Sequence, residues 1–160
     1  MAHIDVPVMY SWPSEASVLQ YTTDRENAEW SAPHLAGFIA SFVRQSGIKT
    51  VHVLAHSMGN HCLTQAMLRW KEGVPEGVLS EVILAAPDVD ASSLRGELAP
   101  IATKFSARLT LYVSTQDVAL QSAKAVISSY ARAGDASSGI VVRPPMETVD
   151  ASSVRTDFMG

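Results

Sequence analysis

The chain has 160 residues, of which 47% are hydrophobic and 18% charged, with a formal net charge of −4. This length fits one domain with its own core better than two. Twelve Lys and Arg residues against sixteen Asp and Glu residues, without a basic cluster, exclude the cationic surface of a nucleic-acid-binding protein. The single cysteine, Cys62, excludes an internal disulfide and a multi-cysteine zinc site.

The targeting signals of exported and membrane proteins are absent from the sequence. No apolar run approaches the roughly 18 residues that a membrane-spanning helix needs. The first residues lack the basic-then-apolar pattern of a signal peptide. We therefore expect a cytoplasmic protein without a membrane or nucleic-acid partner, although a longer, secreted parent protein is also compatible with these residues.

Short apolar runs alternate along the chain with segments of helical periodicity. The runs that have the composition of strands are residues 6–10, 51–55, 82–86 and 109–113, with a weaker run at 140–142 or 146–149. Because they are apolar at nearly successive positions, they predict strands that are buried on both faces.

Between the runs, apolar residues recur at the i, i+3, i+4, i+7 spacing of amphipathic helices. The expected helices are residues 31–43 with Ser31 as the cap and Pro33 in the first turn, residues 63–70 ended by Gly73 and Pro75, a helix from Ser92 or Ser93 to Phe105, and residues 123–130 closed by Gly134. Strands and helices that alternate in this way indicate an α/β fold with a mostly parallel sheet and right-handed βαβ crossovers.

The strongest local signal is the sequence Ala-His-Ser-Met-Gly at residues 55–59, directly after the second apolar run and before the second helix. It matches the strand–turn–helix setting of a nucleophile elbow, G-x-S-x-G, with alanine at the first small position. Because the turn is tight, Ser57 is expected to have a strained backbone and an exposed Oγ. The N–H of Met58 is expected to donate to a developing oxyanion. A serine in an ordinary turn is the alternative interpretation.

An acyl-transfer serine also needs a base and an acid that orients the base. Asp117 follows the 109–113 run at the carboxyl end of its expected strand, where ligand sites of open parallel sheets lie, and is the candidate acid. Asp88 and Asp90 occupy the equivalent loop one strand earlier, and Asp88 is the alternative acid. Helix capping competes with a catalytic role, and it is the stronger explanation for Asp88 and Asp90.

Four segments in one order resemble a bacterial α/β-hydrolase family of unknown function. They are Ser-Trp-Pro-Ser at residues 11–14, Ala-His-Ser-Met-Gly at 55–59, Ala-Ala-Pro-Asp-Val-Asp at 85–90, and Leu-Tyr-Val-Ser at 111–114 with Asp117. The resemblance runs from about Val6 to the last residue. It implies a serine hydrolase with Ser57 as nucleophile and Asp117 as acid, and it implies neither a metal nor an organic cofactor.

The resemblance also implies parts that residues 1–160 do not contain. Members of this family have strands before Val6, with a His-Gly loop that supplies a second oxyanion N–H, and their triad His follows a segment similar to residues 157–160. We therefore expect a single α/β-hydrolase-like domain over residues 1–160 that lacks those strands and the triad His. On its own it is expected to have feeble activity.

Five histidines are candidates for a substitute base. His61 lies on the first turn of the second helix and is the candidate that we retain. A structural role is the simpler explanation for each histidine, and His52, in the middle of an expected strand, is predicted to be buried in the core.

We therefore predict a serine carboxylesterase that acts on short-chain esters through an acyl-enzyme on Ser57. The alternative is a catalytically weak or inert hydrolase-fold core that binds a ligand or a partner. All crossover helices are expected on one face of the sheet, which leaves the opposite face bare and one strand edge unpaired. Because a bare apolar face and an unpaired edge favour association, we predict a homodimer or higher homo-oligomer. Alternatively, residues 131–160 fold back over the bare face.

Overall fold

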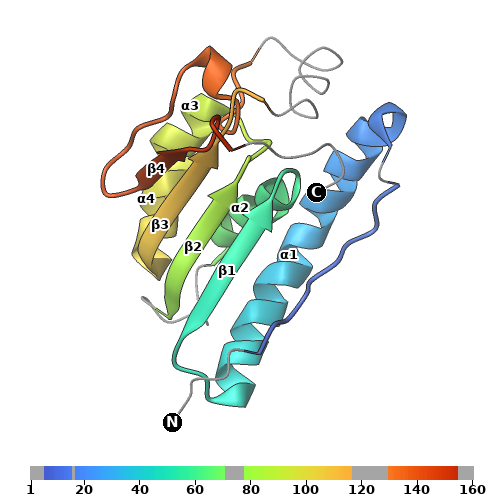
Figure 1. Ribbon diagram of the computed structural model, residues 1–160. Helices are drawn as coiled ribbons and strands as arrows, with labels where there is room; N and C mark the ends of the chain where they lie inside the picture. The colour runs from blue at the N-terminus through green and yellow to red at the C-terminus, as the bar shows by residue number, and fades with distance from the viewer. Residues whose placement is uncertain (1–5, 16, 71–77, 117–129, 155–160) are drawn as a thin grey trace.

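A computed structural model describes residues 6–15, 17–70, 78–116 and 130–154. Four parallel strands form one sheet in the order β1-β2-β3-β4 (Figure 1). The strands are β1 (Val51–His56), β2 (Leu79–Ala85), β3 (Ser106–Val113) and β4 (Glu147–Asp150). The predicted α/β fold with a parallel sheet is confirmed, and β4 corresponds to the second of the two positions considered for the weaker run.

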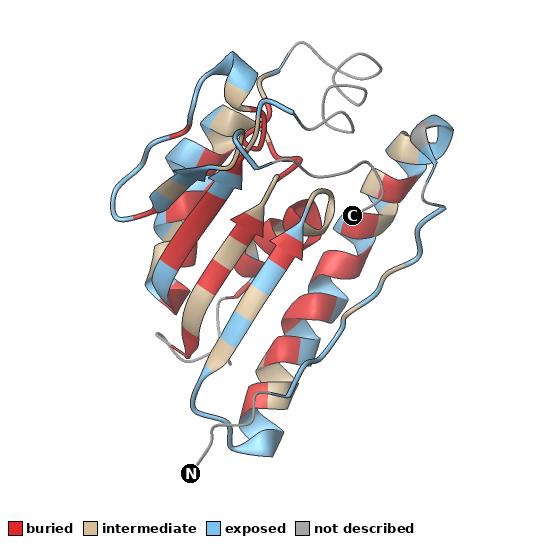
Figure 2. Ribbon diagram, in the orientation of Figure 1, coloured by how far each residue is buried: buried red, intermediate tan, exposed pale blue. Residues whose placement is uncertain are grey.

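One face of the sheet carries the core. Partner residues of parallel strands point to the same face, and the register places Val53 beside Val82 and Val82 beside Leu109. Val82 and Leu109 are buried, together with small and branched residues of the helices α1 (Tyr21–Ser46), α2 (Gly59–Leu68) and α4 (Ala99–Phe105), which lie on this face (Figures 1 and 2). Apolar strands and helix stripes thus bury each other here.

The opposite face of the sheet is not covered by any helix in the described part of the chain (Figure 1). His52, Leu54 and His56 of β1 are exposed there. Arg108 of β3 lies on the same face, where its Nη2 is 2.6 Å from Oε2 of Glu147. The predictions that β1 is buried on both faces and that His52 is a core residue are therefore wrong, because helices pack against one side only.

Residues 6–10 do not form the predicted first strand. They form an irregular segment that runs along α1 (Figure 1). The Tyr10 hydroxyl donates to the Ser31 carbonyl at 3.4 Å, and the Tyr10 ring lies 5.8 Å from that of Phe38. A strand needs a neighbour to pair its N–H and C=O groups, and in the described ranges no strand lies beside this segment. Its side chains contact a helix instead.

Helix α1 begins ten residues before the predicted cap, Ser31. It follows a 3₁₀ turn, η1 (Val18–Gln20), ends at Gly47 with φ of +69°, and contains Pro33 in its interior rather than in its first turn. Ala28 and Ala32 are fully buried, and they extend the packed stripe towards the N-terminus. The first part of α1 is packed through small residues and the buried Asp24 rather than through large apolar side chains. The apolar periodicity of the sequence therefore did not reveal it.

The third helix is a composite of α3 (Ala91–Ser93), a π-helical turn η2 (Leu94–Leu98) and α4. Pro100 follows the widened turn and has no N–H to donate to the Gly96 carbonyl. Most of the fourth predicted helix and the end of the second, at Gly73 and Pro75, lie outside the described residues. In the ranges that the structure describes, the last helical element is a short 3₁₀ turn, η3 (Ala136–Ser138), and none of the helices has the length and apolarity to cross a membrane.

Candidate active site

Ser57 occupies the turn between β1 and α2 and has φ of +49°. A residue with a Cβ rarely adopts this left-handed conformation, which persists only where surrounding contacts enforce it. Its N–H donates to the Ala85 carbonyl at the end of β2 at 3.0 Å. The turn thus has the backbone conformation expected of a nucleophile elbow.

Two residues hold the carbonyl of Ser57. It accepts hydrogen bonds from the backbone N–H and the side-chain Nδ2 of Asn60, each at 3.1 Å, and from the N–H of Asp88 at 3.3 Å. The Nδ2 of Asn60 also donates to the Ala85 carbonyl at 3.1 Å. Both polar backbone groups of Ser57 are therefore held by hydrogen bonds. The role of Asn60 was not predicted from the sequence, because nothing in the motif shows whether its side-chain amide is buried or lies on the helix surface.

The start of α2 lies beside the turn. Met58 is the N-terminal flanking residue of α2, and among the described residues its N–H has no acceptor. A free N–H at a helix N-terminus is a ready donor to an anion. A Cβ added to Gly59 would lie 3.4 Å from Cη2 of Trp12, so the indole ring covers this first turn.

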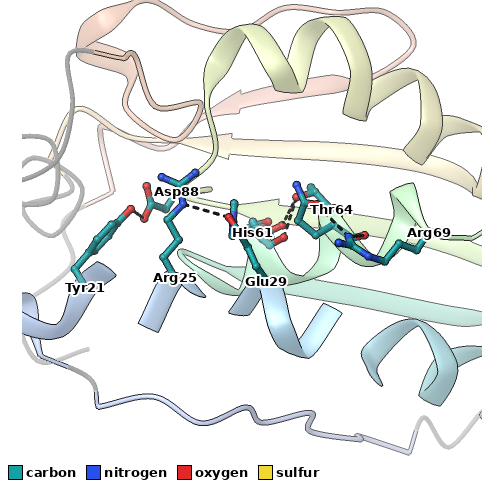
Figure 3. Close-up of polar contacts among 9 residues, drawn as sticks. Tyr21, Arg25, Glu29, His61, Thr64, Arg69 and Asp88 are labelled. Atoms are coloured by element: carbon teal, nitrogen blue, oxygen red, sulfur yellow. Dashed lines mark hydrogen bonds and ion pairs between the residues drawn. The ribbon is translucent and has the colours of Figure 1, made fainter. Parts of the chain in front are cut away.

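Asp88 forms buried polar contacts with two residues that are distant in sequence, and Figure 3 shows the contact with Tyr21. Its Oδ1 is 3.1 Å from Nε of Arg132, an ion pair in which both side chains are at least 96% buried, and its Oδ2 accepts from the Tyr21 hydroxyl. Burial, and then the hydrogen bond to Asp88, raise the pKa of Tyr21 to about 12. Among the described residues, Asp88 neither caps a helix nor bonds to a histidine. Arg132 and Tyr21 were missed because no local pattern links them to it.

Asp90 is the capping residue of this loop. Its Oδ1 accepts from the Ser93 N–H and the Ser92 hydroxyl, each at 2.8 Å, and it begins α3. Burial pushes the pKa of Asp90 up, but the hydrogen bonds from Ser93 and Ser92 outweigh it and the net pKa is lowered. The capping prediction is confirmed for Asp90 and wrong for Asp88.

His61 points from α2 towards α1, where its Nε2 lies 2.8 Å from Oε1 of Glu29 (Figure 3). Burial lowers the pKa of His61, and the hydrogen bond to Glu29 offsets only part of this effect. No hydrogen bond joins His61 to Ser57 in the described part of the structure. The ring of His61 is therefore hydrogen-bonded to Glu29 rather than to Ser57.

The loop that leads to the candidate acid Asp117 starts at the same edge of the sheet as the elbow, because β1 and β3 both end there. The Ser114 N–H donates to the Gly134 carbonyl at 3.0 Å, and the Thr115 N–H donates to the Ser152 hydroxyl at 2.9 Å. Asp117 itself lies outside the described residues.

Neither a metal cluster nor a reactive thiol competes with Ser57 in the described ranges. There, no three His, Cys, Asp or Glu side chains gather as ligands. Cys62 is buried, and burial raises the pKa of its thiol to about 11, so it is protonated at neutral pH.

Comparison with known proteins yields a family and one relative. The family model described as "Alpha/beta hydrolase of unknown function (DUF900)" matches residues 2–149. An uncharacterized protein of Nostoc sp., alr1448, is 41% identical over 54 residues, which cover 34% of this chain and 14% of the relative. No solved structure matches.

Proposed function

Because the chain belongs to the alpha/beta hydrolase family of unknown function, we propose that it is a serine hydrolase, a carboxylesterase for short-chain esters with Ser57 as nucleophile. The observation that carries the proposal is the φ of +49° at Ser57, in a strand-to-helix turn. Strained backbone of this kind clusters at active sites, and a nucleophile elbow places its serine on such a turn. Asp117 is the proposed acid.

The proposed reaction is acyl transfer to Ser57. The Oγ attacks the ester carbonyl carbon, its proton passes to a general base, and the N–H of Met58 donates to the oxyanion. The alcohol then leaves with a proton, and water hydrolyses the acyl-enzyme to release the acid and restore the hydroxyl. Because no described histidine is hydrogen-bonded to the Ser57 Oγ, we propose that the base comes from a part of the polypeptide outside those ranges or from a partner chain.

A second candidate function is a hydrolase-fold domain that is catalytically weak or inert and binds a ligand or partner. The contact between His61 and Glu29 favours this alternative, because it engages the histidine that lies nearest to Ser57 in the helix. An amide or thioester substrate would use the same nucleophile.

Hydrolysis of p-nitrophenyl acetate distinguishes these functions. We expect the wild-type protein to show low, saturable turnover and Ser57→Ala to reduce it to the rate of buffer. Ser41→Ala, on α1, is the matched control and should keep the wild-type rate. Equal turnover by wild type and Ser57→Ala would overturn the proposed esterase function and favour the alternative, a binding domain.

A further inference from the structure

The side chain of Asn60 bridges the two carbonyls that border the strained turn. Its Nδ2 donates to the Ser57 and Ala85 carbonyls, each at 3.1 Å, and the residue is fully buried. The Ala85 carbonyl also accepts from the Ser57 N–H at 3.0 Å. One amide group therefore ties the end of β2 to the turn after β1.

The chemistry of this contact requires an amide. Two carbonyl oxygens need two N–H donors, and only the amide nitrogen of Asn or Gln supplies both from one atom without a charge. The Oδ1 of Asn60 is buried and has no partner among the described residues, which costs free energy. The two N–H donors of the amide nitrogen, rather than the Oδ1 acceptor, thus account for an asparagine at this position.

From this geometry we propose that Asn60 is the positioning residue of the elbow: it holds Ser57 in the left-handed conformation that presents its hydroxyl. The inference rests on the proposed function of Ser57 as nucleophile. Asn60 acts through the backbone and does not touch the substrate. A shift of the nucleophile of about 1 Å is enough to slow a reaction roughly 100-fold.

The test compares Asn60→Asp, which is isosteric but places oxygen against both carbonyls, with Asn60→Ala, which removes both groups. The matched control is Asn27→Asp on α1. The measurements are the rate of Ser57 labelling by a fluorophosphonate probe, and the φ of residue 57 in the crystal structure of each variant. In the wild-type protein, hydrogen exchange at the Asn60 side-chain amide adds a measurement that needs no variant.

We expect labelling to fall about 100-fold in both Asn60 variants, φ at Ser57 to leave the left-handed region, and Asn27→Asp to match wild type. In Asn60→Asp, the labelling rate should recover in part as the pH falls, because a protonated carboxyl donates one hydrogen bond. Both Nδ2 protons of the wild type should exchange slowly.

Unchanged φ and labelling in Asn60→Ala, or rapid exchange of the Nδ2 protons, would overturn the positioning role. If the probe does not label wild-type Ser57, the proposed function fails, whereas the change of φ and the slow exchange still decide the role of Asn60.

Discussion

The Nε2 of His61 lies 2.8 Å from Oε1 of Glu29, which joins α2 to α1 on the covered side of the sheet. The side chain of His61 is 9% exposed. This contact indicates that His61 helps to pack the two helices against each other.

The stability of the protein should depend on pH through His61. Burial lowers its folded-state pKa below the unfolded value of 6.5, with a smaller opposing contribution from Glu29. Between these two pKa values the unfolded chain binds more protons, so the free energy of unfolding should fall as the pH drops through 6.5 towards the folded-state pKa. Urea unfolding from pH 7.5 to 5 measures this fall, at about 1.4 kcal/mol per unit of pKa difference.

His61→Gln should flatten this pH dependence and leave the rate of Ser57 labelling unchanged. Glu29→Gln should extend the fall to lower pH, because it removes the contact that raises the pKa of His61. A pH profile of His61→Gln that overlays the wild-type profile would contradict the packing role, and loss of labelling would make His61 the base.

The ion pair of Asp88 with Arg132 should be needed for stability. Arg132→Met leaves a carboxylate that is 97% buried without its cation, and this costs about 3–5 kcal/mol of unfolding free energy. The double variant with Asp88→Asn should recover most of the loss, because the amide needs no counter-charge and still accepts from Tyr21. Urea unfolding of the wild type, the two single variants and the double variant gives a double-mutant cycle. A small loss in Arg132→Met would show that Asp88 is compensated elsewhere.

Gly134 packs against the loop after β2. A Cβ at this position would lie 2.5 Å from the carbonyl carbon of Ala86, closer than van der Waals contact. We expect Gly134→Ala to lower the free energy of unfolding by about 1–3 kcal/mol. Gly37→Ala, in α1 with open space around it, is the control and should raise it by up to about 1 kcal/mol. Equal changes of the melting temperature in Gly134→Ala and Gly37→Ala would contradict this prediction.

The sheet was largely predictable because β1, β2 and β3 contain apolar runs. The run at residues 82–86 located β2, but the strand starts at Leu79, and the run at 109–113 located β3, which starts at Ser106. Both beginnings carry polar residues, Glu81 and Arg108, which pair side by side on the uncovered face. Apolar runs therefore marked the carboxyl-terminal parts of these two strands and left their beginnings undetermined.

The candidate site was predictable only where it is local in sequence. The small residues around Ser57 reveal a tight turn, and the turn has the expected φ. In contrast, Tyr21 and Arg132 reach Asp88 from distant parts of the chain. Such contacts depend on the packing of α1 and of the segment that contains Arg132, and no local spacing encodes them.

The uncovered sheet face supports our proposal that the protein forms a homodimer. Leu54 is 67% exposed there, with Tyr112 at 38% and Val149 at 39%. Apolar groups gathered on an otherwise open sheet favour association. Light scattering during size exclusion should give twice the chain mass at micromolar concentration, and Leu54→Lys should shift the protein towards monomer. A wild-type monomer at that concentration would refute the dimer.

Covalent labelling of Ser57 tests the central claim most directly. After reaction with a fluorophosphonate, intact-mass and peptide analysis of the wild-type protein should show one adduct, on the peptide that contains Ser57. Ser57→Ala, with folding verified by circular dichroism, should show none, whereas Ser41→Ala should react like the wild type. An adduct on another serine, or equal labelling of wild type and Ser57→Ala, would contradict the assignment of Ser57 as the nucleophile.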